Sequence, residues 1–176
     1  MMNDEFYDNH ENIREAWYQQ LSQDDSYRSG LRFARRIRLA RIVGLAALFV
    51  PLASVLVSQL LSGVWWLLLV GWVFVWPHLA WQLAFRSTCP HGGEIVNLKI
   101  DAIIAGVWMG LIGFNALPTA ALIVMIGMNM MGSGGCRLFL TGLALLALSA
   151  LLTVQSTGTP VLLTSEPLAL WLTLPV

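Results

Sequence analysis

Long stretches without any charged residue dominate the sequence after position 41. Residues 42–85, 102–136 and 138–165 contain no Asp, Glu, Lys or Arg. A helix needs roughly 20 apolar residues to cross the hydrocarbon core of a bilayer, so the first stretch alone is long enough for two crossings. The pattern predicts an all-α fold, a polytopic bundle of membrane helices.

Turn-forming residues divide these stretches into five full spans and an incomplete sixth. Ser62-Gly63 predicts a tight turn, and Pro118 suits the first turn of a helix. The expected spans are 42–60, 64–85, 98–115, 118–132 and 137–155, followed by 167–176. Ten residues rise only about 15 Å, half of a bilayer, so the sixth span stops short.

Two polar segments precede the first span. Residues 1–27 are expected to form a polar tail, because seven of the first 25 residues are acidic. Residues 28–41 hold six arginines and predict a basic juxtamembrane helix, and residues 42–176 form the transmembrane domain. A secretory signal would carry positive charge directly before a short apolar run, so this N-terminus predicts a retained anchor.

Composition and the positions of the basic residues extend this interpretation. The chain is 57% hydrophobic and 11% charged, whereas soluble domains average about 25% charged residues. Basic residues favour the cytoplasmic side, so the tail and two loops are predicted there. The expected topology anchors, which also contact anionic lipid headgroups, are Arg32, Arg35, Arg36, Arg38, Arg41, Arg86, Lys99 and Arg137. The basic segment 28–41 adjoins the membrane and no soluble fold accompanies it, which argues against nucleic-acid binding.

The two cysteines, Cys89 and Cys136, lie in loops predicted to be cytoplasmic. Thiols stay reduced in that compartment, so no disulfide is expected. The spacing of Cys89, His91 and Cys136 matches no strong zinc pattern and lacks a fourth ligand. Neither a metal nor a cofactor is therefore predicted.

Polar residues within apolar helices are the candidates for a functional site. His78 and Gln82 share a helical face, and Asp101 begins the third span on the same side of the membrane. A His78–Asp101 contact would either sense protons or a polar ligand, or simply fix helix packing. Trp76 forms a stripe with Trp65 and Trp72, which would line an aromatic pocket or anchor the helix at the membrane interface.

Ala102, Gly106 and Gly110 repeat at intervals of four residues along the third span. Small residues at this spacing let two helices approach closely. The stripe predicts a packing face, used either within the chain or in a homodimer.

Several segments resemble one family of membrane sensors. They are residues 28–36 (RSGLRFARR), 43–46 (VGLA), 70–82 (VGWVFVWPHLAWQ), 94–101 (EIVNLKID) and 129–135 (NMMGSGG). Together they resemble the second of the MASE (membrane-associated sensor) domains, over about residues 28–176. These domains occur at the N-termini of bacterial diguanylate cyclases, above all the AdrA type linked to cellulose production, and of some adenylate cyclases.

The resemblance implies a sensory module of the bacterial inner membrane that regulates a cytoplasmic cyclase domain and so acts in cyclic di-GMP signalling. The cyclase signature Gly-Gly-(Asp/Glu)-Glu-Phe is missing from these 176 residues, so the chain is not expected to be an enzyme itself. Two other interpretations stay open: a small transporter or channel subunit, and an inactive truncated remnant.

Overall fold

The chain forms a bundle of helices from which one helix projects. The computed structural model describes residues 4–59 and 62–160, and that part is all-helical. The predicted sixth span, 167–176, lies outside the described residues. In chain order the elements are α1 (Asp4–Ser58), α2 (Gly63–Val70), the π-helical turn η1 (Gly71–Val75), α3 (Trp76–Arg86), α4 (Pro90–Leu111) and α5 (Ala116–Thr157).

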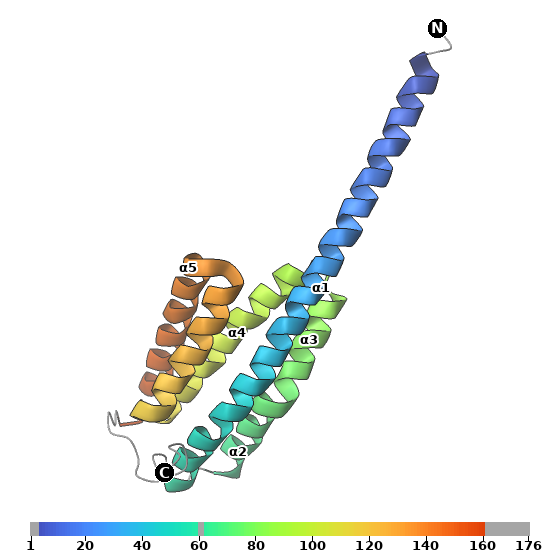
Figure 1. Ribbon diagram of the computed structural model, residues 1–176. Helices are drawn as coiled ribbons and strands as arrows, with labels where there is room; N and C mark the ends of the chain where they lie inside the picture. Colours follow the sequence, from blue (N-terminus) through green and yellow to red (C-terminus); the bar gives the residue numbers. More distant parts are fainter. Residues whose placement is uncertain (1–3, 60–61, 161–176) are drawn as a thin grey trace.

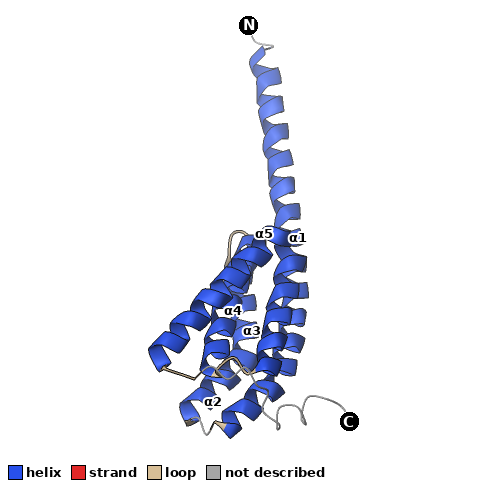
Figure 2. Ribbon diagram, turned by 90° about the vertical axis from the view of Figure 1, so that its left-hand side faces the viewer, coloured by secondary structure: helices blue, strands red, loops and turns tan. Residues whose placement is uncertain are grey.

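The first helix, α1, runs without interruption through three segments that we predicted to be separate. It joins the polar residues 4–27, the basic residues 28–41 and the first predicted span, with Pro51 inside it. The N-terminal half of α1 extends well beyond the bundle (Figures 1 and 2), and the C-terminal half packs within it.

The second predicted span is one continuous rod made of α2, η1 and α3. Pro77 stands in the first turn of α3 and has no backbone N–H to donate to the preceding turn. The helix widens into the π-helical turn immediately before this proline, which shifts the register of the residues on either side.

The third predicted span begins earlier than expected. We predicted a helix over 98–115, but α4 starts at Pro90 and ends at Leu111. Proline is well suited to a first helical turn, so the helix starts at Pro90 and Asn97 becomes a buried interior residue. Gly113 and Phe114 then adopt positive φ angles of 63° and 57° in the turn that leads to α5.

The last helix, α5, is folded back on itself at Gly135. This residue has φ 65° and ψ −161°, a conformation open to glycine and strained for other residues. The break separates an arm over 116–134 from an arm over 136–157, and Figure 1 shows the two arms side by side. It lies between the predicted spans 118–132 and 137–155.

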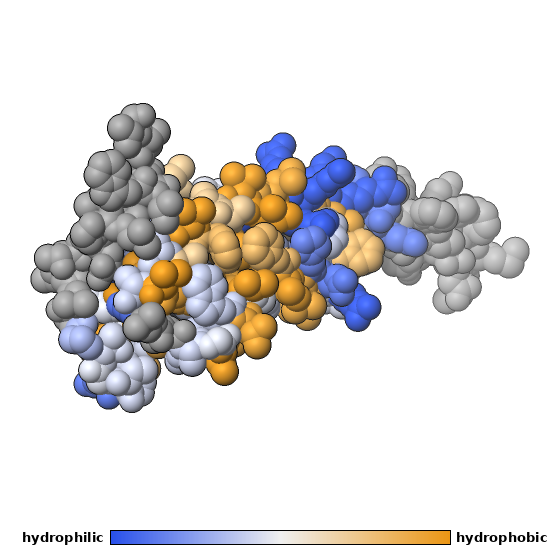
Figure 3. Space-filling view, turned by 90° about the horizontal axis from the view of Figure 1, so that it is seen from below, coloured by the Kyte–Doolittle hydropathy of each residue, from blue (hydrophilic) through white to orange (hydrophobic). Residues whose placement is uncertain are grey.

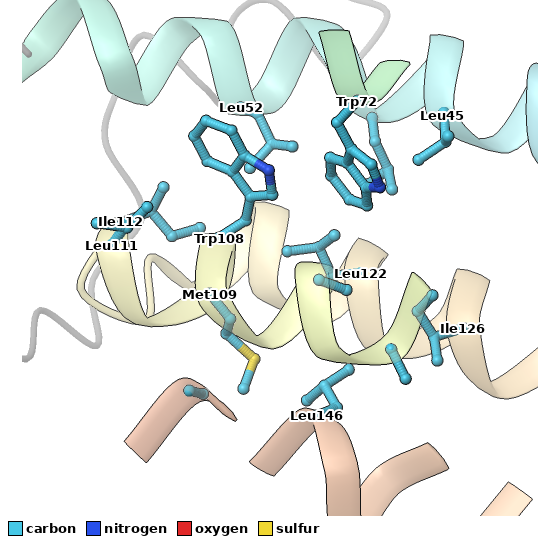
Figure 4. Packing of buried hydrophobic residues seen from close by; sticks show 14 of the residues in the cluster. Leu45, Leu52, Trp72, Trp108, Met109, Leu111, Ile112, Leu122, Ile126 and Leu146 are labelled. Carbon is cyan, nitrogen blue, oxygen red and sulfur yellow. The ribbon is translucent and has the colours of Figure 1, made fainter. Parts of the chain in front are cut away.

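Three helices are long and apolar enough to cross a membrane: Asp24–Ser58, Gly63–Arg86 and Ala116–Thr157. This confirms the all-α membrane architecture. Large apolar side chains cover much of the surface, and Figure 3 shows them as a band beside a cluster of hydrophilic residues. The interior joins every element: Leu52 of α1, Trp72 of η1, Trp108 of α4 and Leu122 of α5 pack together (Figure 4).

Candidate functional site

A buried cluster of charged side chains joins α1, α3 and α4. Arg41 of α1 lies between Glu94 and Asp101 of α4, and all three are at most 1% exposed. Arg41 Nε donates a hydrogen bond to Asp101 Oδ2 over 2.7 Å. Arg41 Nη2 lies 2.6 Å from Glu94 Oε1, close enough for an ion pair, but the pair does not have hydrogen-bond geometry. Arg41 therefore connects α1 to two positions about two turns apart on one face of α4.

The two carboxylates differ in the donors that reach them. Asp101 accepts a second hydrogen bond, from Trp76 Nε1 of α3 over 2.5 Å, so each of its oxygens has a donor. Glu94 Oε2 accepts only a longer bond of 3.2 Å from Asn97 Nδ2. The same Asn97 amide donates to the carbonyl of Ala80 in α3, which adds a second link between α3 and α4.

The cluster lies deep in the apolar part of the bundle. Ten residues separate Trp76, the partner of Asp101, from Arg86 at the end of α3, a rise of about 15 Å along the helix. Ionisable groups inside an apolar bundle are costly unless they are paired, and they commonly mark functional sites. Arg41, Glu94 and Asp101 are paired in this way.

The predicted topology anchors have different surroundings. Arg32, Arg35 and Arg36 are exposed on α1, and so are Arg86 and Arg137, whereas Lys99 is half-buried. Arg38 is half-buried too, with its guanidinium carbon 5.6 Å from the ring centroid of Trp81. Arg41 was predicted to be a topology anchor too, and this prediction is wrong. Its side chain is fully buried in the ion cluster and cannot reach a lipid headgroup.

His78 and Gln82 do not join the cluster. Both are exposed on the outer face of α3, and His78 Nδ1 lies 3.1 Å from the carbonyl oxygen of Phe74. The predicted His78–Asp101 contact is wrong, because the partners of Asp101 are Arg41 and Trp76. Trp76 and His78 are two residues apart on α3, so they point to different sides of it.

An apolar groove runs between the α2–η1–α3 rod and α4, with a cavity volume of about 520 Å³. The predicted stripe of Trp65, Trp72 and Trp76 lines it together with Trp108 of α4. Trp72 and Trp108 stack with their ring centroids 6.3 Å apart. The tryptophan stripe therefore packs against α4 and also forms the wall of this open groove.

The small-residue stripe of α4 faces the second arm of α5. A Cβ on Gly106 would overlap the Ser149 hydroxyl and the Leu146 carbonyl oxygen. A Cβ on Gly110 would lie 2.7 Å from the Ala150 carbonyl oxygen. Ala102 is fully buried in the same helix. The packing partner of Gly106 and Gly110 is thus inside the chain.

Sequence reasoning missed the roles of Arg41, Glu94 and Asn97. One signal was available: Glu94, Asn97 and Asp101 are spaced by three and four residues, so they share one face of a helix. We had assigned Glu94 to a loop, which hid this spacing. Arg41 was indistinguishable from the exposed arginines before it, because only the three-dimensional packing turns it toward α4.

The fold and the buried cluster define a class of protein: a polytopic membrane module whose helices are connected by internal ion pairs. The chain belongs to the MASE2 domain family, which matches residues 36–124, just over half of the chain. The matched region contains Arg41, Trp76, Glu94 and Asp101.

Two curated relatives are similar to the chain, each named "Probable diguanylate cyclase DgcC". They come from Escherichia coli strain K12 and from E. coli O6:H1 strain CFT073. Each is 53% identical over 154 residues, 88% of this chain and 42% of the relative. The chain thus spans about two fifths of the length of these relatives, and its 176 residues hold no cyclase catalytic domain. No solved structure matches it.

Proposed function

We propose that this chain is the membrane-embedded sensory module of a diguanylate cyclase in the bacterial inner membrane. The observation that carries the proposal is the 53% identity to probable diguanylate cyclases over 88% of the chain. The structure supports a membrane-embedded module physically, because α1 carries Arg41 in the buried cluster and extends from there far outside the bundle.

A chimera tests this proposal. The matched region of the K12 relative is replaced by residues 1–176, and cyclic di-GMP is measured in membranes that contain the chimera. We expect activity comparable to that of the relative. A chimera that inserts at the same level and stays inactive, beside an active parent, would refute the regulatory role.

The topology that we propose has five full spans with the N-terminus in the cytoplasm. Two of the spans are the long apolar helix of α1 and the α2–η1–α3 rod. The two arms of α5 are counted as two further spans, and α4, which is largely buried in the bundle, is the fifth. The support is that the exposed Arg86 and Arg137 lie at the α3–α4 junction and the α5 turn, at the end of the bundle from which α1 projects (Figure 1). Basic residues favour the cytoplasmic side, and anionic headgroups there would contact them.

Cysteine accessibility tests the topology. Cys89 and Cys136 are both exposed and lie at the basic end of the bundle. We expect a membrane-impermeant maleimide to label them in inverted vesicles and not in intact spheroplasts. Ser62→Cys and Thr159→Cys, each in a cysteine-free background, should show the opposite labelling. If Cys136 were labelled from the same side as Ser62→Cys, the two arms of α5 would not cross the membrane as two separate spans.

His78 and Gln82 are proposed to contact a second copy of the chain. Both are polar, exposed and four residues apart on an otherwise apolar face of α3. Polar side chains within a membrane usually find partners, and each interhelical hydrogen bond contributes about 0.6 kcal/mol on average. The same two residues stay our candidates for sensing, because a ligand that reaches the bundle from the lipid would meet them first.

Replacing both residues by leucine should weaken the dimer by a few-fold, as fluorescence energy transfer between labelled chains in liposomes would measure. Cyclic di-GMP output of the chimera should change with it. Thr141→Val is the matched control, because the exposed Thr141 hydroxyl already donates to the Arg137 carbonyl of its own helix. An unchanged dimer fraction would exclude this face as the contact.

A further inference from the structure

We propose that the buried cluster of Arg41, Glu94 and Asp101 is a proton-binding site that holds one exchangeable proton. The cluster joins one guanidinium to two carboxyl groups, and none of the three is more than 1% exposed. If both carboxyl groups were ionised, one negative charge would stay uncompensated inside an apolar bundle. Isolated buried charges of this kind are neutralised by taking up a proton.

The surrounding elements offer no second cation to balance this charge. From α1, the guanidinium of Arg38 lies over Trp81 rather than against a carboxylate. From α3, the groups that face the cluster are the Trp76 indole and the Ala80 carbonyl oxygen, both uncharged. On α4, Asn97 is neutral and Lys99 is half-buried, without an ion pair to either acid among the described residues. The charged residue of α5 is Arg137, exposed at the turn.

The contacts place both carboxyl groups against one cation. Both oxygens of Asp101 accept hydrogen bonds, from Arg41 Nε and Trp76 Nε1. Glu94 Oε1 lies 2.6 Å from Arg41 Nη2, and Glu94 Oε2 accepts a bond of 3.2 Å from Asn97 Nδ2. Uptake of one proton by the pair of carboxyl groups leaves the cluster neutral, and release of that proton to the solvent leaves one negative charge beside Arg41.

Proton occupancy would act on helix packing through Arg41. With one carboxyl group neutral, Arg41 and the other carboxylate form a balanced ion pair between α1 and α4. When the proton leaves, two carboxylates compete for one guanidinium, and the link from α1 to α4 changes. The site thus gives the bundle a way to respond to pH or to the proton gradient, independent of any catalytic domain.

The infrared C=O stretch of protonated carboxyl groups tests the proposal. The measurement uses the full 176-residue chain in liposomes at neutral pH, where exposed acids are ionised. The wild type should show the band of one protonated carboxyl. Glu94→Gln and Asp101→Asn should each remove it, because either leaves one acid balanced by Arg41.

Arg41→Gln should double the band, and the control Asp24→Asn, at an exposed acid, should leave it unchanged. The two acid variants decide the question if Arg41→Gln fails to fold. A wild type without the band would overturn the proposal, and so would a band that persists in both acid variants. Neither outcome bears on the chimera experiment, so failure of this site is distinguishable from failure of the proposed function.

Discussion

Replacing Arg41 by glutamine is expected to be among the most destabilising single substitutions in this chain. Among the described residues, Arg41 is the one cation that pairs with Glu94 and Asp101, and all three side chains are buried. Removing one partner of a buried ion pair typically costs about 3–5 kcal/mol, because the carboxyl group left behind must either stay charged without a partner or take up a proton. Titration with SDS, followed by the fluorescence of the eight tryptophans, would measure the loss of unfolding free energy.

Arg35→Gln is the matched control, since Arg35 is an exposed arginine on the same helix. It should change stability by less than about 0.5 kcal/mol, as surface substitutions usually do. A triple variant, Arg41→Gln with Glu94→Gln and Asp101→Asn, removes every charge of the cluster and should recover part of the loss. Equal stability of Arg41→Gln and Arg35→Gln would mean that the buried ion pairs contribute little.

The sequence was sufficient to predict an all-helical fold with long apolar helices, because long uncharged stretches match the length that a bilayer requires. The boundaries that it missed depend on local backbone chemistry. Pro90 starts α4 within a segment that looked like a loop, owing to the suitability of proline for a first helical turn. Gly135 lies between the predicted spans 118–132 and 137–155, and its positive φ angle breaks α5 there.

The candidate site was only half predictable, and the reason is physical. Asp101 was chosen as an ionisable residue at the start of a span and Trp76 as part of a tryptophan stripe, and the two do form a hydrogen bond. Trp76 and His78 are two residues apart, so both cannot face the interior, and the residue pattern does not show which of them does. The packing of α3 on α4 turns Trp76 inward and leaves His78 exposed.

The position of Arg41 shows a further limit of charge patterns. Six arginines in 14 residues predict a basic helix at the membrane surface, and four of them, Arg28, Arg32, Arg35 and Arg36, are exposed as expected. Arg41 differs because it lies one turn deeper than Arg38, at the level of Asp101. Its partners are 53 and 60 residues away, and only the packing of α1 on α4 brings them together.

Replacing Gly106 by alanine is expected to separate α4 from the second arm of α5. The added Cβ would overlap the Leu146 carbonyl oxygen, a backbone atom that cannot rotate away, as well as the Ser149 hydroxyl. Overpacking in a close-packed interior costs about 1–3 kcal/mol of stability. Because the overlapped atom belongs to the backbone, we expect Gly106→Ala to cost at least the upper end of that range. Membrane helices depend on close packing rather than on the hydrophobic effect, so little else compensates.

The control for this prediction is Gly132→Ala. Gly132 lies in the first arm of α5, and a Cβ there would meet nothing within 4 Å. That variant should keep its stability or gain a few tenths of a kcal/mol from the better helix propensity of alanine. Adding Ser149→Ala to Gly106→Ala should restore only part of the loss, since the Leu146 carbonyl stays in place. If Gly106→Ala unfolds at the same SDS fraction as Gly132→Ala, α4 and α5 are not in the contact described here, and the stripe is then free to pair with a second copy.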